Sequence, residues 1–365
     1  MADTPTYWDY LRLPQLLELQ GGLDREEALD NDELHFIVVH QAYELWFKLA
    51  LVELREARNH LDRPRLDEEV VPNTVRHLRR VIEIMRLGVA QFRVMETLTP
   101  LDFLDFRDKL MPSSGFQSFQ MRELEILMGL EDMQRVTYGK VHPLDHIKKL
   151  AEGSPGGAKA WEHISRARSE VTLRAALHAW LYRTPIQGSK PEDPGDEAVV
   201  SGFLDSYLEQ GKARRKAQLD RLIEVGAGTP EGLTERFQAT EDAARTWLLA
   251  LDQAQDRERV RRVRAAALFI ESYRELPLLA WPRLLLDTVV ELEEQMVLWR
   301  NRHARMVERL IGRRVGTGGS SGVDYLDKTT KYRIFTELWA VRSLLSPREA
   351  LPALENQDLY GFHSG

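Results

Sequence analysis

The segment His40-Gln-Ala-Tyr-Glu-Leu-Trp-Phe-Lys-Leu-Ala-Leu-Val52, preceded by Leu34, Phe36, Ile37, Val38 and Val39, is the most informative part of the chain. It is apolar on nearly every side at helical spacing, and such a helix is expected inside a bundle or against a ligand, without a solvent face. Phe36, His40, Tyr43 and Phe47 lie three or four residues apart and share one side. His40 is therefore either a hydrogen-bonded core histidine or the polar group of an apolar pocket.

Helical periodicity dominates the rest of the chain, and convincing two-residue alternation is absent. We therefore expect an all-α fold, a helical bundle in one domain spanning residues 1–365. A more polar helical excursion is predicted between about 150 and 250. The predicted helices are Leu66–Phe92, Phe116–Leu130, Pro282–Ile311 and segments near 158–182, 197–224 and 230–251.

The best-defined helix is predicted from Pro282 to Ile311, with proline at its start and Gly312 just past its end, as is typical of helix termini. His303 occupies a position in its apolar seam that is normally given to leucine. Such a histidine is either a core residue bonded to a carbonyl or a metal ligand. The seam consists of Leu285, Val289, Leu292, Met296, Trp299, His303, Met306 and Leu310.

The chain of 365 residues contains no cysteine. This excludes disulfides, thiolate zinc sites, iron–sulfur clusters and thiolate-ligated haem, so a metal would be held by histidine or oxygen ligands. One explanation for His40 and His303, each on an apolar helix, is a haem between them, with one histidine axial and the other over the open face. A zinc site is less favoured, because the sequence has no HExxH motif and the other histidines are scattered.

Charge and hydropathy limit the partners. The net charge of −7 gives no electrostatic reason to expect nucleic acid. No window approaches the roughly 18 uninterrupted apolar residues of a membrane span, and no secretory signal is visible at the first residues. We therefore expect a cytoplasmic protein with neither a nucleic-acid nor a membrane partner.

Two further segments carry candidate binding groups. The loop Gly316-Thr-Gly-Gly-Ser-Ser-Gly322 is rich in glycine, so it is either a flexible surface loop or a backbone that closes on a small polar ligand. Arg107 follows an aromatic residue and precedes the turn Pro112-Ser-Ser-Gly115. Its guanidinium suits a ligand carboxylate, although an ion pair with Asp105 or Asp108 explains it equally well.

These segments together resemble the tryptophan 2,3-dioxygenase family, haem enzymes that open the indole ring of L-tryptophan. The match keeps its order along most of the chain. It comprises Tyr7-Trp-Asp-Tyr10-Leu, Asp32-Glu33, Phe36-Ile37, the segment from His40 to Lys48, Phe106-Arg107, Pro112 to Ser118, Ala179-Trp-Leu-Tyr-Arg-Thr-Pro185, Leu298-Trp-Arg-Asn-Arg-His303 and Gly316 to Gly322.

The resemblance implies a role for each matched position. His303 would be the proximal ligand of a non-covalent haem b, and His40 the distal histidine facing the indole N–H. The other implied roles are Arg107 for the substrate carboxylate, Thr317 for its amino-acid end, Phe36 and Phe103 for the indole pocket, Ser114 and Gly115 beside the haem, and Tyr7 and Tyr10 reaching an adjacent subunit's site. The family also implies a homotetramer that uses O2 and L-tryptophan in the kynurenine pathway.

Two positions depart from the pattern. Asn31 stands where many members have histidine, and Phe103 replaces a tyrosine found in many bacterial members. Neither removes a catalytic position, but both could tune the pocket. Two alternatives stay open: a haem-dependent mono-oxygenase acting on a tryptophan-like or tyrosine-like substrate, and a helical haem-binding protein without catalysis.

Overall fold

The computed structural model describes residues 5–21, 29–65, 69–111, 113–137, 142–317 and 322–361. Helices dominate these ranges, and within them the only strand-like feature is an isolated bridge between Ile186 and Ser189. The predicted all-α class is confirmed. Across the same ranges, no helix is both long enough and apolar enough to cross a membrane.

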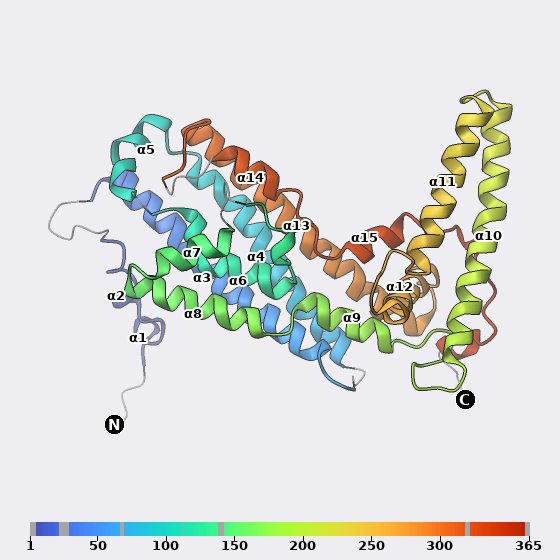
Figure 1. Cartoon of the computed structure of the whole chain (residues 1–365). Helices are drawn as coiled ribbons and strands as arrows, with labels where there is room; N and C mark the ends of the chain where they lie inside the picture. The colour runs from blue at the N-terminus through green and yellow to red at the C-terminus, as the bar shows by residue number, and fades with distance from the viewer. Residues whose placement is uncertain are drawn as a thin grey trace. The chain divides into compact units, whose positions relative to one another are not determined.

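Contacts divide the chain into two compact units. The first comprises residues 1–55, 79–170 and 292–333, and the second comprises 56–78, 171–291 and 334–365. Figure 1 labels the helices. The first unit contains α1 (Tyr7–Leu11), α2 (Leu13–Leu16), α5 (Pro100–Arg107), α6 (Phe119–Met128), α7 (Pro143–Ala151), α8 (Pro155–Ser169) and α14 (Val323–Thr329). The second contains α9 (Leu173–Arg183), α10 (Asp196–Glu224), α11 (Pro230–Leu248), α12 (Arg257–Ser272) and α15 (Thr336–Arg342).

Three long helices contribute residues to both units: α3 (Asn31–Leu61), α4 (Val70–Met95) and α13 (Ala280–Ile311). Helix α3 begins after Asp30, whose carboxylate accepts a hydrogen bond from the Asp32 N–H at 2.8 Å and so satisfies one of the unpaired amides at the helix start. The sequence placed the start of α4 at Leu66, which lies outside the described residues; the structure begins that helix at Val70. The expectation of a single domain stays a prediction.

In the first unit α3 and α4 run antiparallel, because Glu53 meets Arg80 while Val39 meets Gln91. They approach closely at Gly88. The Tyr43 hydroxyl donates to the Gly88 carbonyl at 2.7 Å, and a Cβ at this position would lie 3.3 Å from the Trp299 ring of α13. The absence of a side chain at Gly88 therefore lets the three helices pack around one point.

Helix α13 ends as predicted, with Gly312 in the left-handed conformation at φ 58°. Most of its seam is buried, but Trp299 and His303 are only half-buried. Since their neighbours in the seam are covered by protein, these two side chains face a hollow in the packing. The seam therefore changes from core to cavity wall at His303.

Helix α3 corrects one expectation, because it does have an exposed face. At about 100° per residue, Phe36, His40, Tyr43 and Phe47 lie on one side, whereas a second apolar set lies on the opposite side. That second set is solvent-exposed: Leu34, Val38, Leu45, Leu49 and Val52. The helix is therefore apolar all round because it has two apolar faces. The face that carries Phe36, His40, Tyr43 and Phe47 is covered within the chain, and the opposite face is exposed to solvent.

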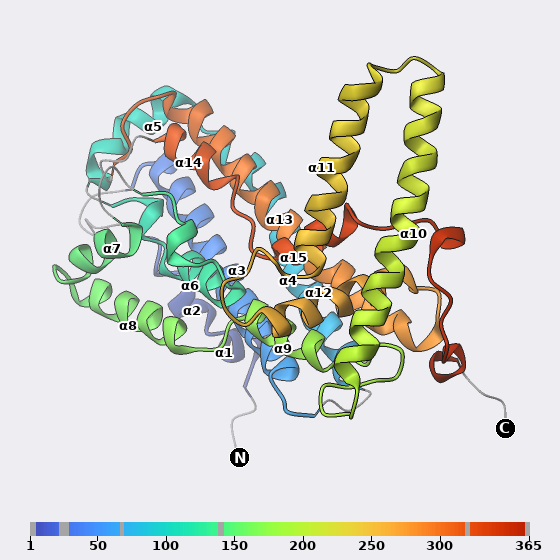
Figure 2. The same ribbon diagram turned by 45° about the vertical axis from the view of Figure 1, so that its right-hand side comes forward.

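The polar segment between 150 and 250 is helical, but the stretch near 158–182 is two helices. Helix α8 ends at Ser169, and α9 begins after Thr172, whose hydroxyl accepts from the Ala175 N–H at 3.1 Å. This threonine cap starts a new helix and interrupts the periodic pattern. Helices α10 and α11 then lie side by side as a hairpin (Figure 2), close to the predicted limits.

Candidate functional site

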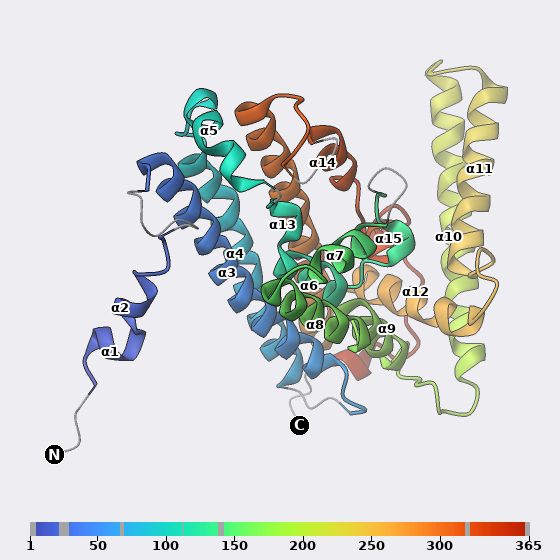
Figure 3. The same cartoon turned by 60° about the vertical axis from the view of Figure 1, so that its left-hand side comes forward.

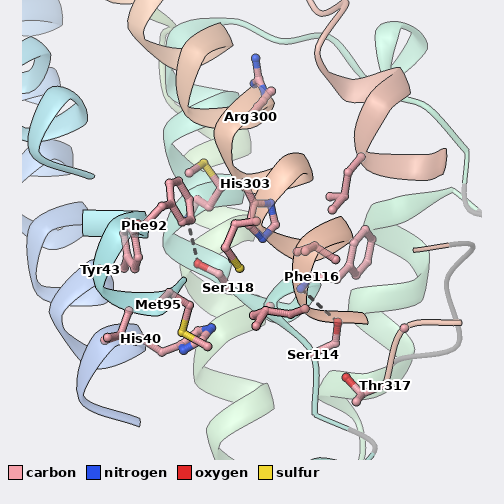
Figure 4. A pocket seen from close by; sticks show the side chains of 18 of the residues that line it. His40, Tyr43, Phe92, Met95, Ser114, Phe116, Ser118, Arg300, His303 and Thr317 are labelled. Atoms are coloured by element: carbon pink, nitrogen blue, oxygen red, sulfur yellow. Dashed lines mark hydrogen bonds between the residues drawn. The ribbon is translucent and has the colours of Figure 1, made fainter. Parts of the chain in front are cut away.

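A cavity in the first unit is lined by residues of α3, α4, α5, α6, α13 and α14, by residues of the turn from Ser114 to Ser118, and by Gly316, Thr317 and Gly322. It brings together most of the predicted site residues, from positions far apart in the sequence (Figure 4). Those that line it are Phe36, His40, Phe103, Arg107, Ser114, Gly115, His303 and Thr317. Tyr7 and Tyr10 do not line it.

His40 is held by its own helix. Its Nδ1 lies 2.8 Å from the carbonyl oxygen of Phe36, one turn earlier. A carbonyl only accepts, so Nδ1 carries the proton and a neutral ring has Nε2 as its acceptor. Burial lowers the pKa of His40 below its usual value, and the Phe36 bond offsets this only in part. Near neutral pH the ring is therefore uncharged, with a lone pair on the nitrogen that the backbone does not use.

His303 lies between aromatic rings. It stacks on Trp299 with centroids 5.1 Å apart and on Phe92 at 5.8 Å. Burial, with smaller contributions from His40 and Arg122, lowers the pKa of His303 to about 4. The imidazole is therefore neutral at pH 7, which is the form that binds metals. Both histidines line the same cavity.

An aromatic wall stands beside His40. The Phe36 ring lies 4.0 Å from the His40 ring, 5.9 Å from Phe103 and 5.7 Å from Phe106. Phe103 meets Phe106 edge to face at 5.4 Å. These contacts hold the rings in fixed orientations. This side of the cavity can therefore accept a flat apolar group next to one hydrogen-bond acceptor.

Arg107 ends α5 and does not form the ion pair that the sequence allowed, because neither Asp105 nor Asp108 lies within ion-pair distance of it in the described chain. One terminal nitrogen donates to the Val315 carbonyl. Its Nε is buried without a partner. A half-paired guanidinium at a cavity wall still has donors for an anion.

Thr317 and the turn after α5 complete this end of the cavity. The Thr317 hydroxyl donates to the Ser113 carbonyl at 2.6 Å, which leaves its oxygen lone pairs as acceptors. Ser114 caps the following turn by accepting from the Phe116 N–H at 3.3 Å. A Cβ at Gly115 would meet nothing within 4 Å, so the backbone there borders open space. Residues 318–321 of the predicted glycine-rich loop lie outside the described residues.

The N-terminal aromatic residues are exposed. Tyr7 is 69% and Tyr10 80% accessible, and Figure 3 shows α1 and α2 standing clear of the helices that line the cavity. At the start of α1 the Thr6 hydroxyl accepts from the Asp9 N–H, and the Asp9 carboxylate accepts from the Thr6 N–H. This capping box stabilises the first turn of the short helix. The tyrosines are therefore presented outward from the chain that carries them.

Sequence reasoning missed a buried ion cluster at the cavity wall. Glu125 is 2% exposed and pairs with Arg122 at 3.2 Å, Arg135 at 2.7 Å and Arg300 at 3.1 Å. Burial alone would raise the pKa of Glu125, but the three arginines outweigh it and lower the pKa to about 2. Arg135 also meets the half-exposed Asp132 at 3.5 Å, so three guanidiniums meet two carboxylates and the cluster carries a net positive charge. Arg122, Glu125 and Arg300 all line the cavity.

A signal for this cluster was present in the sequence. Arg300 precedes His303 by three residues and so lies on the same side of α13. Arg122 and Glu125 have the same spacing within the predicted helix from Phe116 to Leu130. Charged residues on the cavity side of two apolar helices indicate buried ion pairs or an anion. In the part of the chain that the structure covers, no group of three or more His, Asp or Glu side chains could hold a metal ion.

The sequence is similar to known proteins along nearly its whole length. Residues 2–345 match the family model described as tryptophan 2,3-dioxygenase. Over 98% of the chain, the sequence is 48% identical to a protein of Sorangium cellulosum named tryptophan 2,3-dioxygenase, 87% of which is covered. It is equally similar to tryptophan 2,3-dioxygenase 2 of Ralstonia nicotianae, with 97% of that protein covered. A Bdellovibrio bacteriovorus protein named tryptophan 2,3-dioxygenase is 34% identical over 98% of both chains. The chain belongs to the tryptophan 2,3-dioxygenase family.

Proposed function

We propose that this protein opens the indole ring of L-tryptophan with O2, giving N-formyl-L-kynurenine, and that it does so with a non-covalently bound haem b. One observation carries the proposal: the free hydrogen-bonding groups of the cavity have the polarity that the three polar ends of tryptophan require. The family assignment and the names of its relatives support it.

The residues present fit a haem. His303 makes no hydrogen bond within the described residues and is neutral, as an axial ligand must be. Trp299 Nε1 and Arg122 Nε are buried at the cavity wall without partners. The excess positive charge of the cluster around Glu125 suits the carboxylates that a porphyrin carries, and the aromatic and aliphatic lining suits its flat ring. His303 would hold the iron, and Arg122 and Arg300 would face the carboxylates.

Haem iron supplies the oxygen activation that none of the side chains in this site can provide. The protein's own contribution is to bind and orient the substrate so that its reacting bond is in place. Arg107 donates to the substrate carboxylate, and Phe36 and Phe103 pack against the indole ring. The apolar lining excludes water around them.

The polarity match can be followed group by group. The carboxylate of tryptophan only accepts, and Arg107 offers donors. The ammonium only donates, and Thr317 offers oxygen lone pairs because its proton is committed to Ser113. The indole N–H only donates, and His40 offers Nε2 because Nδ1 is committed to Phe36. His40 therefore orients the indole through a hydrogen bond without having to act as a base.

We propose a homotetramer as the working form, with Tyr7 and Tyr10 of one subunit completing the site of the next. The exposed apolar face of α3 supports an interface with a second copy: Leu45 is 52% and Val52 53% exposed, and such a stripe at helical spacing is typical of helix packing. Leu45→Glu should lower the mass seen by light scattering. The matched control is Val225→Glu, an exposed valine in the second unit. A tetramer that survives Leu45→Glu would contradict this interface. A cytoplasmic location stays a prediction.

Mass spectrometry after incubation with ¹⁸O2 tests the reaction. Reduced, haem-loaded protein is given L-tryptophan, and we expect one product that carries both labelled oxygen atoms. A product with one labelled atom would support the mono-oxygenase alternative, and absence of turnover in protein that retains its haem would support the non-catalytic alternative. Either result overturns the proposal.

A further inference from the structure

A second cavity lies in the other unit, lined by residues of α10, of α11 and of the segment after α15. It is open to solvent on one side and has a volume of about 570 Å³, within the range of small-molecule sites. Its residues are Gly211, Arg214, Arg215, Gln218, Arg236, Phe237, Thr240, Ala244 and residues 343–347. No residue of the haem-site proposal belongs to it.

The charged lining of this cavity has one sign. Arg214, Arg215 and Arg236 contribute positive charges, and no aspartate or glutamate lines it, although the whole chain carries a net charge of −7. None of the three makes an ion pair with a described residue. By contrast Lys212, on the same helix, pairs with Glu241. Arg215 is half-buried, whereas Arg214 and Arg236 are exposed; like charges gathered around one cavity repel, and a bound anion would offset that repulsion.

Arg215 provides a second, independent observation. Its Nε and one terminal nitrogen are buried and have no hydrogen-bond partner. Other arginines of this unit also have a buried Nε without a partner, but Arg262 and Arg264 each pair through their terminal nitrogens with an aspartate, Asp196 and Asp252. Arg215 has no such carboxylate partner among the described residues. A buried nitrogen that lacks an acceptor costs free energy, and an acceptor bound in the cavity would remove that cost.

The neutral groups of the cavity add to the same pattern. The hydroxyls of Ser343 and Ser346 and the side-chain amide of Gln218 line it and form no side-chain hydrogen bond to the described residues. Phe237 and Leu345 add an apolar surface to this polar lining. Unused donors together with an apolar surface suit an anion that carries an organic body.

We propose that this cavity binds a small organic molecule through a phosphate group. Arginine forks match the oxygens of phosphate in paired hydrogen bonds, and the seryl hydroxyls can donate to the remaining oxygens. The Phe237 ring can pack against the organic part. Three guanidiniums suit a dianionic phosphate better than the single charge of one carboxylate.

Isothermal titration calorimetry on the full-length, haem-loaded protein tests this. The probes are AMP, inorganic pyrophosphate, adenosine and citrate. We expect AMP and pyrophosphate to bind at one per chain, with no binding of adenosine, which lacks the phosphate. Binding of citrate in place of the two phosphates would overturn the phosphate assignment, and absence of binding by every probe would overturn the site.

Variants locate the binding. Arg215→Gln and Arg236→Gln should each weaken AMP binding at least tenfold, whereas Arg221→Gln, which removes an exposed charge of α10 outside the cavity, should leave it unchanged. Circular dichroism checks folding, and the exposed Arg236 keeps the test valid if Arg215→Gln does not fold. Equal weakening by all three variants would mean attraction by general charge and would refute the site. Arg107→Leu should have no effect, which separates this cavity from the proposed tryptophan site.

Discussion

Replacement of Glu125 by glutamine tests how the buried ion cluster is held. The substitution keeps the size of the side chain and removes its charge. In the native chain this carboxylate pairs with Arg122, Arg135 and Arg300, and Arg135 and Arg300 are themselves only 5% and 4% exposed. The variant would leave three guanidiniums beside one another in a buried region, without their shared anion.

The structure sets the size of the effect. The pKa of Glu125 falls from 4.5 to about 2 on folding, a difference that corresponds to about 3 kcal/mol of stability. Removal of one partner from a buried ion pair generally costs about 3–5 kcal/mol. Because the two routes agree, we expect Glu125→Gln to lower the free energy of unfolding by about 3 kcal/mol at pH 7.

The pH dependence has a definite sign. A carboxylate whose pKa is lowered in the folded state stabilises the fold above its unfolded pKa, and that contribution is lost as the pH falls from 4.5 toward 2. Urea unfolding of the haem-free protein should therefore show a constant difference between wild type and Glu125→Gln from pH 8 to 5.5, and a shrinking one below 4.5.

A matched control is Glu83→Gln, which breaks an exposed pair with Arg86 and should cost less than 1 kcal/mol, as is typical of surface pairs. A Glu125→Gln variant within about 1 kcal/mol of wild type at pH 7 would refute the reasoning, because the three arginines would then be neutralised by something other than this carboxylate.

Three further substitutions test the proposed site. His303→Ala should abolish haem binding, seen as loss of the Soret band, and an unchanged spectrum would refute its assignment as ligand. Arg107→Leu should weaken tryptophan binding at least tenfold while affecting tryptamine, which lacks the carboxylate, much less; equal losses in equilibrium titrations would contradict the carboxylate contact. His40→Ala should keep the Soret band and lower turnover, whereas loss of the haem would exchange the roles of the two histidines.

Much of the fold was predictable because a long helix repeats its buried positions every three or four residues. The seam of α13 could be read from Leu285 to Leu310, and its end from Gly312, since packing and capping there depend on neighbours within the same helix. The candidate site was predictable to a lesser extent. Spacing alone left His303, His40 and Arg107 each with two interpretations, and the resemblance to a family indicated which of the two to prefer.

The sequence could not show which side chains from distant positions in the chain contact each other. Glu125 meets Arg300 across 175 positions, and no local periodicity reports such a contact. The same limit explains Arg107: the nearby acids Asp105 and Asp108 were plausible partners by spacing, but the fold brings the Val315 carbonyl to it from 208 positions away. A single sequence reports the face on which a residue lies, and only the fold shows what meets that face.

The two histidines show how the fold can assign opposite tasks to the same side chain. Burial keeps both rings neutral, so charge does not distinguish them. The difference is made by the neighbours. The Phe36 carbonyl fixes which nitrogen of His40 carries the proton, so His40 keeps a single directed acceptor, suited to an N–H group. His303 is held by ring stacking on Trp299 and Phe92, which constrains the plane of the ring without occupying a nitrogen. A ring fixed in plane with its nitrogens unbonded suits a metal, whereas a ring with one nitrogen tied to the backbone suits the orientation of a substrate.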